Sequence, residues 1–139
     1  MFFRTKLHIV EGLKQLIRIQ FLVLALLASF NFTYSQELEE LDFGKAALEY
    51  EKITQIKPKD HFANYRMGMC LLKLRRSQEA LPYFDAAIAA KSDYKEAFGQ
   101  RGVIKLQKGD VTGCDDLKRA VKLGEDAESV KELISQHCK

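Results

Sequence analysis

The chain has 139 residues, of which 47% are apolar and 29% are charged, and only two are prolines; this composition excludes collagen-like and low-complexity chains. Its length corresponds to a single domain. The whole net charge of +3 lies in residues 1–35, because residues 36–139 carry equal numbers of basic and acidic side chains. The absence of a basic stripe in residues 36–139 argues against nucleic acid as a partner.

The first predicted element is a signal peptide over residues 1–35. Residues 19–32 contain no charge, and as a helix they would extend about 21 Å, less than the hydrocarbon core of roughly 30 Å. Lys14 and Arg18 precede this apolar run, and the small or polar residues 33–35 follow it, an order typical of secretory signal peptides. We expect cleavage after Ser35, export to the periplasm or the medium of a bacterial cell, and no membrane insertion after cleavage.

Other interpretations of this segment stay open. It is long for a signal peptide, and a true start nearer Leu13 would give the usual length. The same residues also fit an uncleaved signal anchor or a buried helix.

Beyond the leader, the sequence repeats itself with a period of 34 residues. A third copy continues with one residue fewer, so that a shift of 33 superposes Phe84 on Leu117 and Ala87 on Ala120. At a shift of 34, small residues coincide with small ones and large apolar residues with large ones: Ala46 with Ala80, Tyr50 with Phe84, Ala63 with Ala97, Gly68 with Gly102 and Leu72 with Leu106.

This period resembles that of the tetratricopeptide repeat family over about residues 42–124, and the leader makes the chain similar to a small exported bacterial member. The resemblance rests on Met67-Gly68, Ala80, Phe84, Ala87 and the turn Lys108-Gly109-Asp110. It implies an all-α fold, a solenoid of helical hairpins or α–α superhelix, because a single pair cannot bury its apolar face alone. We expect a partial first repeat over 36–58, a second over 59–92, a third over 93–124 and a C-terminal capping helix over 125–139.

Local signals predict the bounds of the individual helices. We expect helices over about 44–56, 61–74, 78–90, 94–107, 113–123 and 127–137. Asp115 and Asp116 fall in a first helical turn, where the helix dipole favours acidic side chains. The expected N-terminal caps are the side chains of Asp60, Ser77 and Asp126 and the pair Asp93 and Glu96.

The first repeat departs from the pattern, because its first helix should occupy roughly residues 27–40, which overlap the leader. After cleavage the chain would begin with a helix that lacks its partner. The apolar residues of that helix would form an exposed interface, Ala46, Tyr50 and Ile53. Such a face invites a partner or self-association, so a homo-oligomer is one alternative.

The resemblance implies a groove that binds peptides or proteins along the first helix of each pair. A helix that is apolar all round is more often covered on both sides, and this alternative stays open. Lys, Asn and Arg clamp a peptide carboxylate in some relatives, but Tyr65, Met69 and Gly99 occupy those positions here, so that specificity is not implied. The candidate groove residues are Phe62, Tyr65, Met69, Leu72, Lys73, Val103 and Leu106.

The three cysteines have different expected roles. Cys70 lies in the middle of a predicted helix and behaves as a small apolar residue. Cys114 and Cys138 lie at ends that antiparallel helices bring together, so an oxidising compartment would allow a disulfide between them. Two free thiols packed at a helix end are the alternative.

No constellation in the sequence suggests catalysis, a metal site or a cofactor, since paired cysteine spacings and glycine-rich phosphate loops are absent. The leading hypothesis is a non-catalytic adaptor in the cell envelope that recognises a protein or peptide. A self-assembling or structural subunit that uses the exposed first helix is the alternative, and an enzyme or enzyme accessory comes third.

Overall fold

A computed structural model describes the backbone of residues 2–138 and the side chains of residues 14–138. The outer ends of the predicted leader and capping segment, Met1 and Lys139, lie outside the described residues. The described chain is helical and contains no strand. Its elements are α1 (Phe2–Ile56), α2 (His61–Lys73), α3 (Ser77–Ala90), α4 (Lys95–Gln107), α5 (Gly113–Lys122) and α6 (Glu128–His137).

The chain divides into two units, Met1–Glu39 and Glu40–Lys139. The first unit is the N-terminal part of α1, and its described side chains are all exposed. The Ser29 hydroxyl donates to the Leu26 carbonyl at 2.9 Å and the Thr33 hydroxyl to the Ser29 carbonyl at 2.7 Å, so these polar groups are satisfied within the helix. The stretch from Lys14 is long and apolar enough to cross a membrane, a property that signal sequences share.

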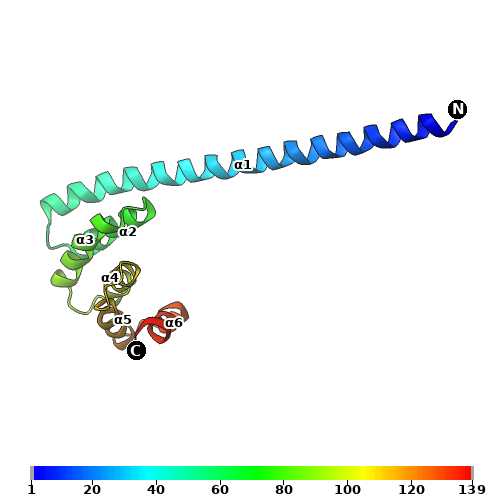
Figure 1. Cartoon of the computed structure of the whole chain (residues 1–139). Helices are drawn as coiled ribbons and strands as arrows, with labels where there is room; N and C mark the ends of the chain where they lie inside the picture. Colours follow the sequence, from blue (N-terminus) through cyan, green and yellow to red (C-terminus); the bar gives the residue numbers. More distant parts are fainter. Residues whose placement is uncertain (1, 139) are drawn as a thin grey trace. The chain divides into compact units, whose positions relative to one another are not determined.

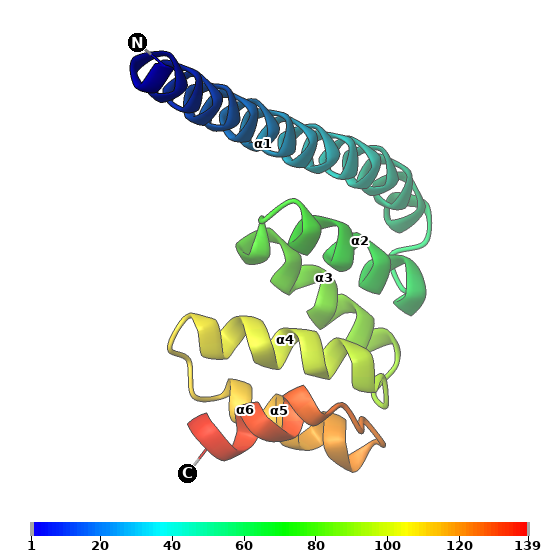
Figure 2. The same cartoon turned by 90° about the vertical axis from the view of Figure 1, so that its right-hand side faces the viewer.

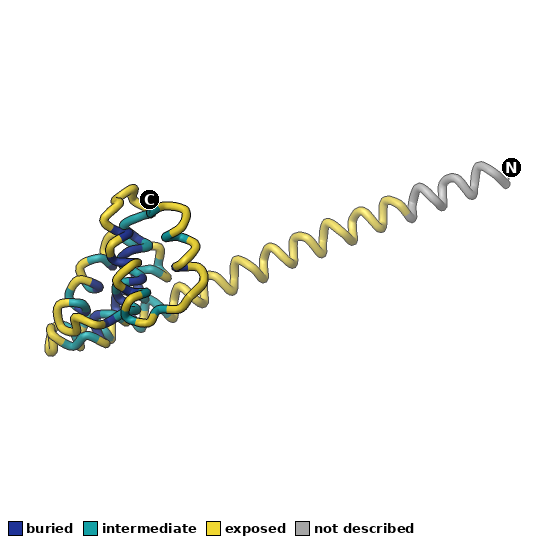
Figure 3. Tube along the Cα trace, turned by 90° about the horizontal axis from the view of Figure 1, so that it is seen from below, coloured by how far each residue is buried: buried dark blue, intermediate teal, exposed yellow. Residues whose placement is uncertain are grey.

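The second unit is a stack of antiparallel helical hairpins. Helices α2 and α3 form one pair, α4 and α5 form the next, and α6 packs against α5 (Figures 1 and 2). Figure 3 shows the buried residues gathered where these helices meet. The main core cluster contains Ala47, Met67, Cys70, Leu71, Ala80, Phe84, Ala87, Tyr94, Ala97 and Ile104. The all-α solenoid predicted from the repeat period is therefore confirmed.

Small residues allow the two helices of each pair to approach closely. A Cβ atom added to Gly68 would lie 2.8 Å from the ring of Phe84, and one added to Gly102 would lie 2.8 Å from the Leu117 side chain. Gly113, which sequence reasoning did not single out, faces Gly102: a Cβ there would lie 2.5 Å from the Gly102 carbonyl oxygen. The periodic small residues thus fix the spacing between paired helices.

From α2 onward the helix bounds agree with the predicted ones within one residue, but most of the predicted caps are wrong. The Asp60 carboxylate accepts from the Ala63 amide at 3.0 Å, as predicted. The N-caps of α3, α4 and α6 are Arg76, Tyr94 and Ala127, and none uses a side-chain capping bond. Neither Ser77 nor the pair Asp93 and Glu96 caps a helix, and Asp126 instead binds the Lys131 ammonium at 2.5 Å.

The turns within the two hairpins share one backbone conformation. Gly109 has φ +79°, in the left-handed region that favours glycine. Arg75, 34 residues earlier, adopts φ +59° at the equivalent position of the α2–α3 turn. Asp110 stabilises the later turn by accepting from the amide and hydroxyl of Thr112, at 2.9 and 2.8 Å.

The first repeat has one helix where the second and third have two. Residues 27–40 are helical, but α1 continues through them to Ile56 without a turn. The helix ends before Pro58, as predicted. Ala46 and Tyr50 are half-buried and Ile53 is 39% exposed. This end of the stack therefore lacks its outermost helix.

Candidate functional site

The predicted groove residues lie on the accessible side of α2 and α4. Phe62 is 54% exposed, and Tyr65, Met69 and Leu72 are half-buried along the same stripe of α2. Val103 and Leu106 of α4 are also half-buried, and Lys73 is exposed at the end of α2. The opposite stripe of α2, which includes Ala63, Met67 and Leu71, is buried. Helix α2 is thus covered fully on one side only, and we call the accessible side the α2–α4 face.

An aromatic cluster joins α2 to the start of α4. The ring of Tyr94 lies 5.1 Å from that of Tyr65 and 5.3 Å from that of His61, and Tyr65 also lies 5.9 Å from Phe84. Burial raises the pKa of Tyr94 to about 12, and burial with the nearby Glu96 carboxylate raises the pKa of Tyr65. Both phenols therefore remain neutral at physiological pH and keep their hydrogen-bond donors. The α2–α4 face has a rigid aromatic base.

A group of charged side chains ties α4 to its neighbours on both sides. The Arg101 guanidinium binds Asp116 of α5 through two bonds of 2.7 and 2.5 Å and Asp85 of α3 at 2.6 Å. Lys105 adds a second cation 2.9 Å from Asp116, whose side chain is only 8% exposed. Asp116 lies in the first turn of α5 as predicted, but its main role is this buried ion pair. Sequence reasoning missed it because the partner lies 15 residues away.

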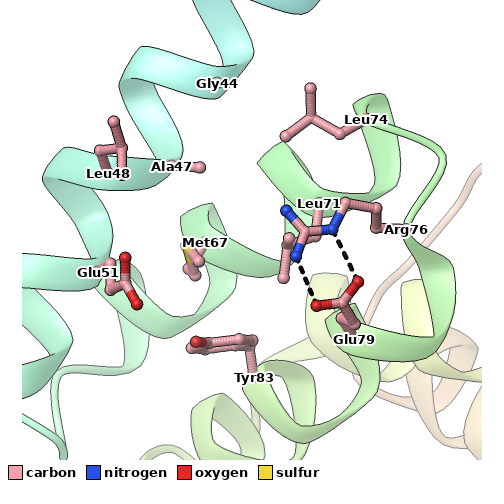
Figure 4. Close-up of a pocket in the computed structure, with 10 residues that line it drawn as sticks. All are labelled: Gly44, Ala47, Leu48, Glu51, Met67, Leu71, Leu74, Arg76, Glu79 and Tyr83. Carbon is pink, nitrogen blue, oxygen red and sulfur yellow. Dashed lines mark hydrogen bonds and ion pairs between the residues drawn. The ribbon is translucent and has the colours of Figure 1, made fainter.

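A cleft of about 220 Å³ separates α1 from α2 and α3 (Figure 4). Repeat shifts of 34 and 33 superpose its residues Met67, Leu71 and Tyr83 on Arg101, Lys105 and Asp116. The charged side chains that fill the junction between later repeats are therefore missing here, which leaves α1 less firmly packed. The lining residues are Gly44, Ala47, Leu48, Glu51, Met67, Leu71, Leu74, Arg76, Glu79 and Tyr83.

The structure brings Cys114 and Cys138 together. Their Cα atoms lie 5.5 Å apart and the sulfur atoms are bonded, closing a segment with a sequence separation of 24. The bond ties the end of α6 to the start of α5. Cys70 is a buried free thiol, and burial raises its pKa. Among residues 14–138 no group of His, Cys, Asp and Glu side chains could hold a metal ion.

Taken together, the stacked antiparallel hairpins and their period define the second unit as an α-helical repeat protein. No family model matches the chain. It is 34% identical to mouse DnaJ homolog subfamily C member 3 over 80 residues, which are 57% of this chain and only 16% of the mouse protein. The hairpin geometry of this chain is that of tetratricopeptide repeat (TPR) domains.

Solved TPR structures have the same fold. The first TPR of Spaghetti (RPAP3), bound to an HSP90 peptide, superposes with a TM-score of 0.65 at 15% identity, over 71% of this chain and 79% of that one. The TPR domain of P58(IPK) superposes with a TM-score of 0.61 at 26% identity, over 68% of this chain and 26% of that one.

Proposed function

We propose that the chain is a non-catalytic adaptor that binds a protein or peptide along the α2–α4 face. The observation that carries the proposal is the accessible apolar stripe of Phe62, Tyr65 and Met69 on a rigid aromatic base. Aromatic and methionine side chains that are fixed but accessible are typical of binding surfaces. The peptide bound to the TPR of RPAP3 supports the same use of the fold.

The chemistry of the face favours an apolar segment over a chain-terminal carboxylate. Tyr65, Met69 and Gly99 occupy the positions where some relatives carry the cations and amides of a carboxylate clamp, and Gly99 is buried. A tyrosine ring and a methionine thioether gain most from apolar or aromatic side chains. Tyr65 and Met69 are therefore the proposed anchors for the bound segment.

The first functional prediction concerns these anchors. The double variant Tyr65→Ala/Met69→Ala should weaken capture of the partner from an envelope fraction about tenfold or more, because anchor residues carry most of the binding energy. The matched control is Tyr50→Glu, which alters α1 and leaves the α2–α4 face intact. Loss of capture only with the Tyr50→Glu variant would contradict the proposed face.

Export to the cell envelope is the second part of the proposal. Two separate features support it: the order of basic, apolar and small residues before Gln36, and the pairing of Cys114 with Cys138. Disulfides persist in oxidising compartments and are rare in the cytosol. The proposed adaptor therefore acts in the periplasm or after secretion.

Cleavage of the leader gives the second prediction. The protein purified from the envelope or the medium should begin at Gln36, because residues 33–35 form the expected recognition site for signal peptidase. The intact mass and the N-terminal peptide, measured by mass spectrometry, check this. A protein that retains residues 14–35 in the membrane fraction would instead be an uncleaved signal anchor.

The exposed apolar residues of α1 favour a second candidate function, a self-assembling subunit. It is compatible with the adaptor role, since the two surfaces use different helices.

A further inference from the structure

The solvent exposure of one set of equivalent positions differs among the three repeats. In the second repeat Ala80, Phe84 and Ala87 have no exposed surface, and in the third Leu117 and Ala120 have none either. The equivalent residues of the first repeat are Ala46, Tyr50 and Ile53, which are half-buried or exposed. We call these three residues the α1 face. Helix α2 covers one side of this face, where Arg66 lies over the Tyr50 ring and donates to its hydroxyl at 3.3 Å. The helix that covers the other side in the later repeats is absent from the described residues.

The covered interfaces follow a rule of size. The large residue of the second helix packs against a glycine of the first: Phe84 against Gly68, and Leu117 against Gly102. In both cases an added Cβ would lie 2.8 Å from the large side chain, so the covering helix must present a small residue there. A helix that covers Tyr50 must meet the same requirement.

The preceding segment of the chain does not meet it. A shift of 34 places Tyr34 at the position of Gly68, so a hairpin of the usual geometry would set one tyrosine ring against another. The other end of the stack is different, because the outer side of α6 carries the exposed residues Lys131, Glu132, Ser135 and Gln136. A polar outer side is the usual way in which a repeat stack ends. Within the described residues, only the α1 end of the stack is left open.

We propose that a second copy of this chain covers the α1 face through an antiparallel, two-fold pairing of α1 helices. Helix α1 carries a small residue and a ring one turn apart, so a two-fold axis between them sets Ala46 of each copy against Tyr50 of the other. The size rule is then met twice.

The pairing predicts a weak, concentration-dependent dimer. One helix of this length buries less area than a permanent interface requires, so we expect dissociation in the micromolar range, on the order of 1–100 µM. Sedimentation equilibrium on the protein purified after export measures this constant. A monomer throughout that range would overturn the proposal and leave the α1 face for another protein.

Two variants distinguish specific packing of Ala46 against Tyr50 from unspecific hydrophobic association. Ile53→Glu should weaken the dimer at least tenfold by placing a charge in the interface. Ala46→Leu makes the face more apolar, yet it should also weaken the dimer at least tenfold, because the added carbons fill the space of the opposing ring. A stronger dimer with Ala46→Leu would overturn the proposed pairing.

The control variant is Leu48→Glu, since Leu48 is 59% exposed on α1 but lies outside the α1 face. Its dissociation constant should stay within about twofold of the wild-type value, and an equal loss with this variant would show unspecific association. Far-UV circular dichroism and thermal midpoints confirm that each variant is folded. The Tyr65→Ala/Met69→Ala variant should still dimerise, so failure of the dimer and failure of the adaptor role give different results.

Discussion

Replacement of Asp116 by asparagine is expected to lower the free energy of unfolding by about 3 kcal/mol. The Asp116 side chain is 8% exposed and accepts from both Arg101 and Lys105. The variant removes the anion that Lys105 binds and leaves Arg101 with only the exposed Asp85, in a region that is largely shielded from water. The loss of stability comes mainly from leaving these cations buried with too little negative charge, and not from the missing attraction itself. Urea unfolding followed by circular dichroism measures the effect.

Two further variants test this cause. Asp85 also binds Arg101, at 2.6 Å, but its side chain is 59% exposed, so Asp85→Asn should cost less than about 1 kcal/mol. The triple variant Arg101→Leu/Lys105→Met/Asp116→Leu replaces the charged group by apolar side chains. It should return to within about 1 kcal/mol of the wild-type stability, because replacement of a whole buried ion pair is often neutral. An equal loss for Asp85→Asn and Asp116→Asn would refute burial as the cause.

The repeat period predicted the helical hairpins because the packing of one helix on another requires residues of particular sizes at fixed positions. These positions therefore recur in the sequence with the period of the repeat. A shift of 34 superposes Gly68 on Gly102 and a shift of 33 superposes Phe84 on Leu117, and the structure packs each glycine against the large residue of its own pair. Gly113 escaped notice because it replaces an alanine, Ala80, after the period has shortened to 33. Its fit against the Gly102 carbonyl depends on the distance between two backbones, which residue identity does not reveal.

The predicted cap of α6 failed because another partner binds its side chain. Asp60 caps α2 because its carboxylate lies free beside the Ala63 amide. Asp126 binds Lys131, which makes a stronger, charge-assisted bond than a backbone amide does. Local sequence rules do not identify such a competing side chain, because its approach depends on the geometry of a residue several positions away.

The α2–α4 face could be predicted only in part from the sequence. An apolar stripe from Phe62 to Leu72 is compatible with a covered helix and with an open groove, and only the structure shows that Phe62 is exposed while the other residues of the stripe are half-buried. The aromatic contact between Tyr65 and Tyr94 joins residues 29 positions apart and needs the fold itself. The ion pairs of Arg101 are missed for the same reason, since Arg101 and Asp116 lie in different helices of one hairpin.

Removal of the disulfide should cost about 3 kcal/mol, measured as the change in unfolding free energy of the variant Cys114→Ser/Cys138→Ser. The bond closes a segment with a sequence separation of 24, and it limits the conformations of the unfolded chain accordingly. Addition of dithiothreitol to the wild-type protein should have the same effect, and it should have none on the double variant. Cys70→Ala serves as the control, because Cys70 is a free thiol and this variant should keep the response to dithiothreitol.

The loss of stability on removal of the disulfide should be confined to the helices that it joins. This distinguishes a local constraint from a contribution to the stability of the whole stack. In a repeat stack each helix is stabilised mainly by its neighbours, and α6 contributes only one buried side chain, Val130. The bond to Cys114 is therefore the main constraint on the last helix. Hydrogen exchange should quicken in α6 and the start of α5 when the disulfide is absent, while α2 and α3 keep their protection. Uniform loss of protection along residues 61–137 would instead make the disulfide a determinant of the whole stack.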